Sequence, residues 1–195
     1  MIDASTGESA RPCQGDIIRD VEYIEYVQEQ DGVLEVSRIV FPLAIVLTQD
    51  CDLQQDPRFS GEDAKSQDKL LISALLAPIY NAEHVYAGEH LSDLKMHMEP
   101  INKRKSPGKY LRQNERPRYH YLEFPPDIQI AASVIDFKHY FSVHLDYLTA
   151  LKKRTYVCTV GPLFREDVTH RFSSFLARIG LPELGEKAKV GGPAS

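Results

Sequence analysis

Hydrophobic and polar positions alternate in the first part of the chain, as they do in β-strands that cover a core with one face. The stretch DIIRDVEYIEYVQE, residues 16–29, alternates in part and is rich in β-branched and aromatic side chains. The tripeptide QDG at residues 30–32 is a hairpin turn signal, and VLEVSRIV at residues 33–40 predicts the partner strand. Because Pro42 cannot donate to a strand ladder, we expect a bend or a sheet edge there.

Two apolar runs follow this hairpin. Residues 43–48 are nearly all apolar, which predicts a strand buried on both faces, and KLLISALLAPIY at residues 69–80 predicts a second buried strand. The polar stretch at residues 54–68 carries turn residues and predicts a loop. Residues 139–151 fit neither pattern. Shorter strands are predicted at residues 118–124, 129–137 and 155–161.

Helical spacing occurs in two places. Apolar side chains between residues 81 and 105 recur three to five positions apart, and Asn81 or Ser92 could cap the start of a helix. A second helix follows a Gly-Pro pair and ends before Gly180. Its apolar stripe consists of Leu163, Val168, Phe172, Phe175 and Leu176.

These elements predict one α+β domain at residues 13–184. A curved, barrel-like antiparallel sheet comes first, helices are inserted after its central strands, and one helix packs at the C-terminus. With 195 residues, 43% of them apolar, the chain can bury one sizeable core. Residues 1–12 and 185–195 are rich in small residues and poor in large apolar ones, so we expect them to lack fixed structure.

Charge and cysteine content indicate a cytoplasmic protein that does not enter membranes. The formal net charge is −5, and no apolar run is long enough to cross a bilayer. The first residues lack the basic start and apolar stretch of a signal peptide. Cys13, Cys51 and Cys158 are odd in number and far apart, which fits reduced thiols better than a disulfide framework.

A basic segment lies between residues 101 and 118. It contains seven basic residues and one acidic residue, Glu115, which gives it a net charge of +6. The rest of the chain therefore carries a net charge of −11. Cations interleaved with tyrosines are typical of surfaces that bind single-stranded nucleic acid, where rings stack on bases. The candidate RNA-binding residues are Lys103, Arg104, Lys105, Lys109, Arg112, Arg116, Arg118, Tyr119 and Tyr121. The alternatives are a solvated loop and, for the tyrosines, a place in the core.

The stretch VLTQDCDLQQD, residues 46–56, leads an apolar strand into two acids and a thiol. If the strand continues, Asp50 and Asp52 share one face about 6–7 Å apart and could hold a divalent cation or share a proton. If the chain turns at Asp50, the carboxylates accept backbone N–H bonds instead. In the third alternative, Asp50 and Asp52 form a charged rim that binds a partner.

Cysteine and histidine chemistry is less favoured. The two flanking carboxylates should raise the pKa of the Cys51 thiol, which argues against a cysteine nucleophile. A zinc site at Cys51 would need distant ligands such as His120, His139 or His144. Because His120 borders the basic segment, we include it with Asp50 and Asp52 as a candidate catalytic residue. No other cofactor is expected.

Three motifs in order resemble those of the PemK/MazF-type toxins, small SH3-like barrels that cleave RNA. They are QGDII at residues 14–18, FPLAIVLTQD at residues 41–50 and LLISALLAPI at residues 70–79. The resemblance covers about the first 80 residues and implies an SH3-like barrel and RNA as a partner. Tyr80 stands where those toxins have a catalytic Thr or Ser. Their catalytic Arg lies in the loop before the strand that follows the Pro, and Arg38 is the only residue nearby that could substitute for it. The resemblance therefore implies a fold relative with altered or lost cleavage activity.

The whole chain also resembles a group of uncharacterised bacterial and phage-borne proteins. They share the Gly-Asp-Ile start, a CD pair after a Val-rich strand and a closing pattern that here includes RIGLP at residues 178–182. Arg171 and Arg178 lie on one face of the last helix, beside its apolar stripe. A partly buried Arg needs a carboxylate partner, so we expect a structural ion pair with Asp50 or Asp52.

Three functions follow from these observations. The first is an RNA-interacting protein related to toxin endoribonucleases. The second is a metal-assisted hydrolase that uses Asp50 and Asp52, with His120 or His144 as a third ligand or base. The third is a non-enzymatic module that binds a partner protein, such as a component of a toxin or defence system, through its acidic surface and exposed sheet edges.

Overall fold

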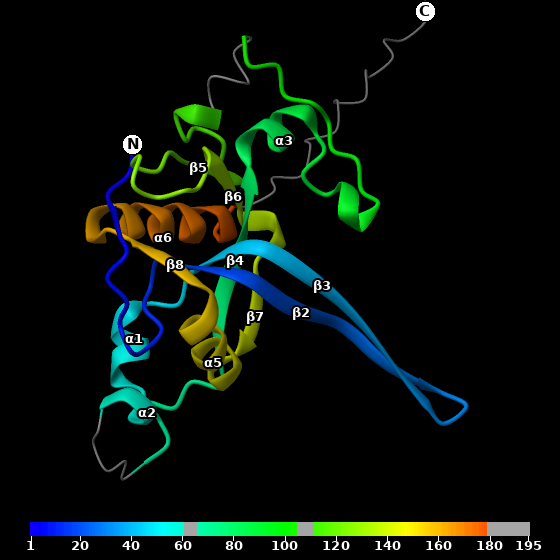
Figure 1. Cartoon of the computed structure of the whole chain (residues 1–195), viewed down its shortest axis with the longest axis vertical. Coiled ribbons are helices and arrows are strands. Elements are labelled where there is room, and N and C mark those ends of the chain that lie inside the picture. Colours follow the sequence, from blue (N-terminus) through cyan, green and yellow to red (C-terminus); the bar gives the residue numbers. More distant parts are fainter. Residues whose placement is uncertain (61–65, 105–110, 179–195) are drawn as a thin grey trace, which may run out of the picture.

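A computed structural model describes residues 1–60, 66–104 and 111–178 of the chain (Figure 1). Its strands are β1 (Ala4–Ser5), β2 (Asp16–Gln30), β3 (Val33–Val46), β4 (Ser73–Asn81), β5 (Tyr119–Leu122), β6 (Ser133–Asp136), β7 (Phe141–His144) and β8 (Tyr156–Val160). Its α-helices are α1 (Asp50–Gln55), α2 (Pro57–Ser60), α3 (Ala82–Ala87), α5 (Leu145–Thr155) and α6 (Pro162–Leu176). Short 3-10 turns lie at η1 (Ser92–Leu94) and η2 (Phe137–His139).

The described strands form one antiparallel sheet in the order β1-β8-β2-β3-β4-β6-β5, and β7 pairs with β4 beside this path. The combination of an antiparallel sheet with helices confirms the mixed α and β composition that the sequence predicts. The sheet is open, so the described residues do not form the closed barrel that we expected.

Both faces of the central strands are covered. Ile17 and Ile45 pack with Phe172 and Phe175 of α6 on one face. On the other face, a second apolar cluster forms around Leu148 of α5. Its strand members include Ile18, Val21, Ala44 and Val46. The prediction that residues 43–48 are buried on both faces is confirmed for its central part, because Ala44 to Leu47 are all buried.

Several local predictions are also confirmed. The hairpin turn has left-handed backbone at Asp31 (φ 52°) and Gly32 (φ 78°), as two-residue hairpin turns require. Pro42 lies where β3 has no partner on its outer side, since β3 pairs with β4 only from Ala44 to Val46. The last helix, α6, begins with Pro162 at its first turn.

The helix expected over residues 81–105 is wrong beyond its first turns. Asn81 caps α3 by accepting a hydrogen bond from the Glu83 backbone N–H at 2.8 Å, as predicted. The helix then ends at Gly88, which has a φ of 78°. A Cβ atom at Gly88 would lie 2.2 Å from the Met98 carbonyl oxygen, so the returning chain needs a glycine there. Tertiary contact thus overrides the helical spacing.

Two other segments differ from the prediction. The polar stretch after residue 50 contains the short helices α1 and α2 rather than a loop alone. Asp56 is fully buried between these helices and accepts hydrogen bonds from Arg58 and from the Leu71 backbone. The ambiguous residues 139–151 divide into β7 and the start of α5, with His144 capping the helix.

The N-terminus has fixed structure, contrary to our expectation for residues 1–12. The short strand β1 pairs with β8, and Ile2 is buried in the apolar cluster beneath α6. The Ile2 backbone N–H donates to the Glu123 carbonyl at 2.8 Å. A few apolar residues are enough to hold a terminus when an open strand edge is available. The tail expected at residues 185–195 lies outside the described residues.

The β2–β3 hairpin projects from the body of the molecule as a long two-stranded arm (Figure 1). Strand β2 pairs with β8 only at Asp16–Ile18, and β3 pairs with β4 only at Ala44–Val46. Between residues 20 and 40, which we call the arm, the two strands pair only with each other in the described part of the chain.

Replacing Ile2 with alanine tests whether the N-terminus belongs to the core. Because the substitution removes buried apolar surface and leaves a cavity, Ile2→Ala should lower the free energy of unfolding by about 2–4 kcal/mol. Ile72→Ala is the matched control, since Ile72 is 77% exposed and its loss should change stability by less than about 0.5 kcal/mol. Equal effects of the two variants in urea unfolding would refute the assignment.

Candidate functional site

The chain turns at the start of the VLTQDCDLQQD stretch, since β3 ends at Val46 and α1 begins at Asp50. Asp50 accepts two hydrogen bonds from the Arg11 guanidinium, at 3.0 and 3.1 Å, and faces the Gln14 backbone N–H at 3.3 Å. The chain therefore turns before Asp50, but the backbone donor is Gln14, 36 positions away, rather than the Asx-turn that we expected. Asp52 lies two residues along the helix, roughly 200° around its axis, and is exposed. The two carboxylates therefore do not face one another.

The charge on Asp50 is compensated from within the protein. Burial would raise the pKa of Asp50, but the hydrogen bonds and charge of Arg11 outweigh it, so the pKa is lowered. Arg165 of α6 adds a weaker ion pair at 4.0 Å. Asp50 thus anchors the N-terminal segment to α1 and α6.

The expected ion pairs of Arg171 and Arg178 with Asp50 or Asp52 are wrong. Arg171 donates to the backbone carbonyls of Arg116 and Tyr119, each at 3.0 Å. Arg178 lies over the Phe175 ring, 3.8 Å from its centroid. The anchoring role falls to Arg11 and Arg165 instead, because the last helix presents its earlier turns to α1.

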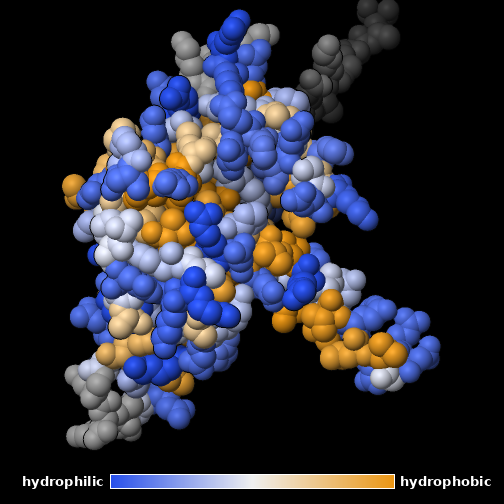
Figure 2. Space-filling model, viewed as in Figure 1, coloured by the Kyte–Doolittle hydropathy of each residue, from blue (hydrophilic) through white to orange (hydrophobic). Residues whose placement is uncertain are grey.

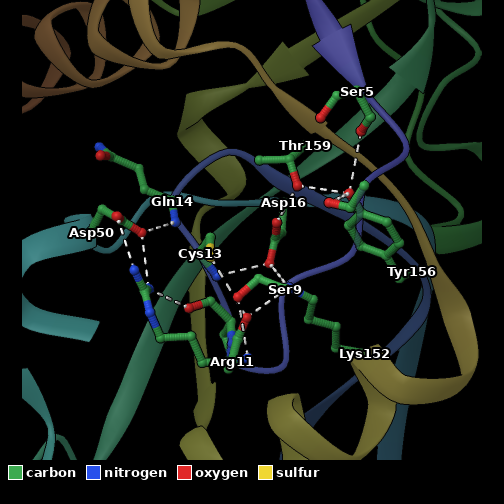
Figure 3. A network of polar contacts seen from close by, with 12 residues as sticks. Ser5, Ser9, Arg11, Cys13, Gln14, Asp16, Asp50, Lys152, Tyr156 and Thr159 are labelled. Carbon is green, nitrogen blue, oxygen red and sulfur yellow. Dashed lines mark hydrogen bonds and ion pairs between the residues drawn. The ribbon is translucent and has the colours of Figure 1, made fainter. Parts of the chain in front are cut away.

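Figure 3 shows a second polar network beside Asp50, centred on Asp16 of the QGDII motif. Asp16 is fully buried and forms an ion pair with the buried Lys152 of α5 at 2.7 Å. Its carboxylate also accepts from the Cys13 backbone N–H at 2.7 Å and the Thr159 hydroxyl at 2.6 Å. Lys152 donates in addition to the Arg11 carbonyl. The motif thus ties β2, α5 and β8 together.

His120 is almost entirely buried. It is 2% exposed on β5, and its ring centroid is 6.3 Å from that of Phe137. Burial, with the nearby charge of Arg171, lowers the pKa of His120 to about 3. The imidazole is therefore neutral near pH 7. In Figure 1, β5 lies at the opposite end of the body from α1, so His120 does not converge with Asp50 and Asp52.

Described residues of the basic segment are largely engaged within the protein. Lys103 pairs with Glu83, and the Arg112 guanidinium lies 5.6 Å from the Tyr121 ring centroid. Tyr119 is buried and Tyr121 is half-buried, so neither ring is open for a base to stack on. Arg104 is exposed and Arg116 half-buried. Lys105 and Lys109 lie outside the described residues.

Arg118 joins a buried cluster centred on Asp136. The guanidinium binds the carboxylate through two hydrogen bonds of 2.8 and 2.5 Å, and His139 and His90 lie 3.1 and 3.7 Å from it. Burial alone would raise the pKa of Asp136. The hydrogen bonds of Arg118 and the two histidines outweigh the effect of burial, so the pKa of Asp136 is lowered. Burial, followed by the Asp136 charge, raises the pKa of Tyr80. A cation predicted to face RNA is thus part of an internal ion pair.

No metal-binding arrangement is formed by the described residues. No group of three or more His, Cys, Asp or Glu side chains is placed to hold an ion among them. His144, the alternative third ligand, lies beside Asp146 at 3.7 Å, at the start of α5 rather than at α1. Within the same residues, no helix is long and apolar enough to span a bilayer.

The arm carries the most unusual exposed surface of the described residues. Cross-strand pairs alternate between two faces, and a bulge at Glu25 keeps Ile24 and Val27 on the same face. Five apolar side chains share that face and form what we call the apolar stripe: Ile24, Val27, Leu34, Val36 and Val40. Each is between 48% and 65% exposed. Figure 2 shows apolar surface running along the arm.

The opposite face of the arm is held to the body at its base and is polar further out. Tyr23 and Ile39 pack on the apolar cluster beside α5, and Tyr147 of α5 accepts a hydrogen bond from the Glu22 backbone N–H at 2.9 Å. Towards the tip, Gln28 donates to Glu35 across the strands at 2.6 Å. The stripe therefore lies on the face that does not pack on the body, where its apolar side chains alternate with the charged Glu22, Arg38 and Glu29.

The sequence contains a signal for the stripe. Apolar residues occur at regular positions in both strands of the hairpin, a pattern that is also typical of strands facing a core. The missing information was where the neighbouring strands end, since a sequence pattern does not distinguish a covered face from an open one.

No protein-family model, curated protein or solved structure matches the chain. The resemblance to the PemK/MazF-type toxins therefore rests on the sequence motifs alone.

Lys152→Met tests the Asp16 network. Removing the ammonium leaves a buried carboxylate without its counter-charge, so the free energy of unfolding should fall by about 3–5 kcal/mol in urea titration. The neighbouring Lys153 is exposed, and Lys153→Met should change stability by less than about 0.5 kcal/mol. A small loss for Lys152→Met, close to that of the control, would show that the pair is not structural.

The buried His120 predicts a loss of stability in mild acid. Its folded pKa of about 3 lies below the unfolded value near 6.5, so the unfolded state takes up the proton first as pH falls. The protonation of this group should therefore lower stability by about 2 kcal/mol between pH 6.5 and 4.5. In His120→Gln this part of the pH profile should be flatter. An unchanged slope would contradict the assignment of the loss to His120.

Proposed function

We propose that the protein is a binding module that recognises another protein through its arm. The apolar stripe is the observation that carries the proposal, because five neighbouring apolar side chains are open to solvent on one face of a projecting hairpin. Soluble proteins seldom leave contiguous apolar surface exposed unless a partner covers it. The two strands are hydrogen-bonded to each other along the arm, so binding there would require little ordering of the chain.

The charge of the arm defines the chemistry of the partner. Residues 20–40 contain six acidic residues and one basic residue, Arg38, so the arm has a net charge of −5, equal to that of the whole chain. Arg38 is itself paired with Glu22 at 3.1 Å. A partner that places apolar side chains on the stripe and lysines or arginines around it would complement both features.

The same charge disfavours two other occupants. Nucleic acid would bring phosphates to a surface of like sign. A second copy laid arm against arm would bring two charges of −5 together, which costs free energy at low ionic strength. RNA binding and metal-assisted hydrolysis also have less support from the described residues, since Asp50 and Arg118 are ion-paired and His120 and Tyr119 are buried.

Selection of peptides displayed on phage tests the proposal while the partner itself is unidentified. Random peptides are selected on the wild-type protein and then counter-selected on Val27→Thr/Val36→Thr, which replaces a cross-strand pair of the stripe by polar isosteres. Surviving peptides should combine apolar residues with Lys or Arg. As synthetic peptides they should bind the wild type about tenfold more tightly than the variant, and less tightly at higher salt.

Val33→Thr is the matched control, because Val33 is 62% exposed but belongs to the opposite face of the arm. Its binding should equal that of the wild type. Selected peptides that bind Val27→Thr/Val36→Thr as tightly as the wild type, or that are acidic, would overturn the proposal.

Sedimentation equilibrium distinguishes a separate partner from a second copy. The wild-type protein should remain monomeric as its concentration rises. A dimer that forms at micromolar concentration and disappears in Val27→Thr/Val36→Thr would show that the stripe is a self-association surface instead.

A further inference from the structure

The two long edges of the arm differ in their freedom to pair with another strand. The outer edge of β2 is engaged at its base, where the Glu22 N–H donates to Tyr147. The outer edge of β3 has no strand partner from Val33 to Leu43 within the described residues. An unpaired strand edge can accept an extended segment of another chain through main-chain hydrogen bonds.

This free edge leads into a pocket at the base of the arm. The pocket has a volume of about 450 Å³ and opens where β3 and β4 separate beyond their last paired residues. Leu43, Leu94 and Ile130 contribute apolar lining, and Val40 belongs to both the pocket and the stripe. Figure 2 shows apolar surface at the base of the arm next to that of the arm itself.

The pocket is aromatic on one side and acidic at its edge. His90 and Tyr80 line it, with their rings in edge-to-face contact at 5.1 Å between centroids. The His90 side chain is 1% exposed, and neither of its ring nitrogens has a hydrogen-bond partner. Glu89 and Asp93 are exposed lining residues, and Arg19 is the one exposed cation beside them apart from histidine. Such a site suits an apolar or aromatic group next to a positive charge.

We propose that the partner's extended segment pairs as an additional strand with the outer edge of β3 and inserts an aromatic side chain into this pocket. The inference rests on the proposed function, because the same segment covers the apolar stripe. Alternate side chains of the segment extend the apolar face of the arm, where Glu22 and Glu29 also lie, and those between them place Lys or Arg on the face of Glu35. The aromatic side chain at its end is the anchor of the interface.

Tryptophan fluorescence tests the inference directly, since the chain contains no tryptophan. The probes are two synthetic peptides, WKVKVKVK and KVKVKVKW. Because β3 runs from the arm tip towards the body, an antiparallel peptide would bring its N-terminus to the pocket and a parallel one its C-terminus. One of the two should therefore show a blue-shifted emission on binding and bind at least about tenfold more tightly than KVKVKVK.

Substitutions in the pocket provide matched controls. Leu94→Lys places a cation in the pocket wall and should abolish the blue shift and weaken binding about tenfold. Met96→Lys adds the same charge two residues away, at a side chain that is exposed and does not line the pocket, and should leave binding unchanged. Asp93→Asn, at an exposed residue, should weaken binding a few-fold without disturbing the fold.

The outcomes separate this inference from the proposed function. If peptide binding depends on Val27 and Val36 but the emission stays unshifted and Leu94→Lys acts like Met96→Lys, the pocket is not used and only the inference fails. If neither peptide binds at millimolar concentration, strand addition by a basic segment is refuted, while the phage selection still decides the proposed function. If binding is indifferent to the stripe, both fail.

Discussion

The structure depends on a mismatch between the lengths of neighbouring strands. β2 and β3 have 15 and 14 residues, but each pairs with a neighbour on its outer side over only three. Where the neighbours are present, the strands are buried on both faces beneath α5 and α6. Where they end, the same two strands continue with an exposed face that carries the stripe and with an edge that has no strand partner among the described residues. The candidate function follows from this single change of environment.

The body gives the arm a fixed base. The ion pair of Asp16 with Lys152 joins the first residues of β2 to α5, and Asp50 is held by Arg11 and Arg165. Such buried polar contacts add specificity of position more than net stability, because desolvation offsets much of the attraction between the charges. An arm joined to a well-defined base, with its two strands paired to each other, can present its stripe with little reorganisation on binding.

Local patterns in the sequence predict much of the fold. The hairpin turn at Asp31 and Gly32, the buried end of β3 and the helix α6 all follow from spacing and turn chemistry between close neighbours. Contacts between distant residues were not predictable in this way. The Asp16–Lys152 pair spans 136 positions, and Gly88 ends a helix because Met98 returns against it. The sequence reveals only that Arg118 is a cation in a basic segment, which predicts RNA binding. In the structure, Asp136 binds Arg118 inside the protein.

In the part of the chain that the structure describes, nothing covers the stripe in the free protein. Methyl NMR of a dilute sample with a soluble nitroxide measures this directly, since the nitroxide broadens the signals of solvent-accessible groups. The account predicts strong broadening for Ile24, Val27, Leu34, Val36 and Val40, and sharp signals for the buried Ile17 and Ile45. If the five stripe residues stayed as sharp as the two core residues, the arm would be covered in solution and the account would be contradicted.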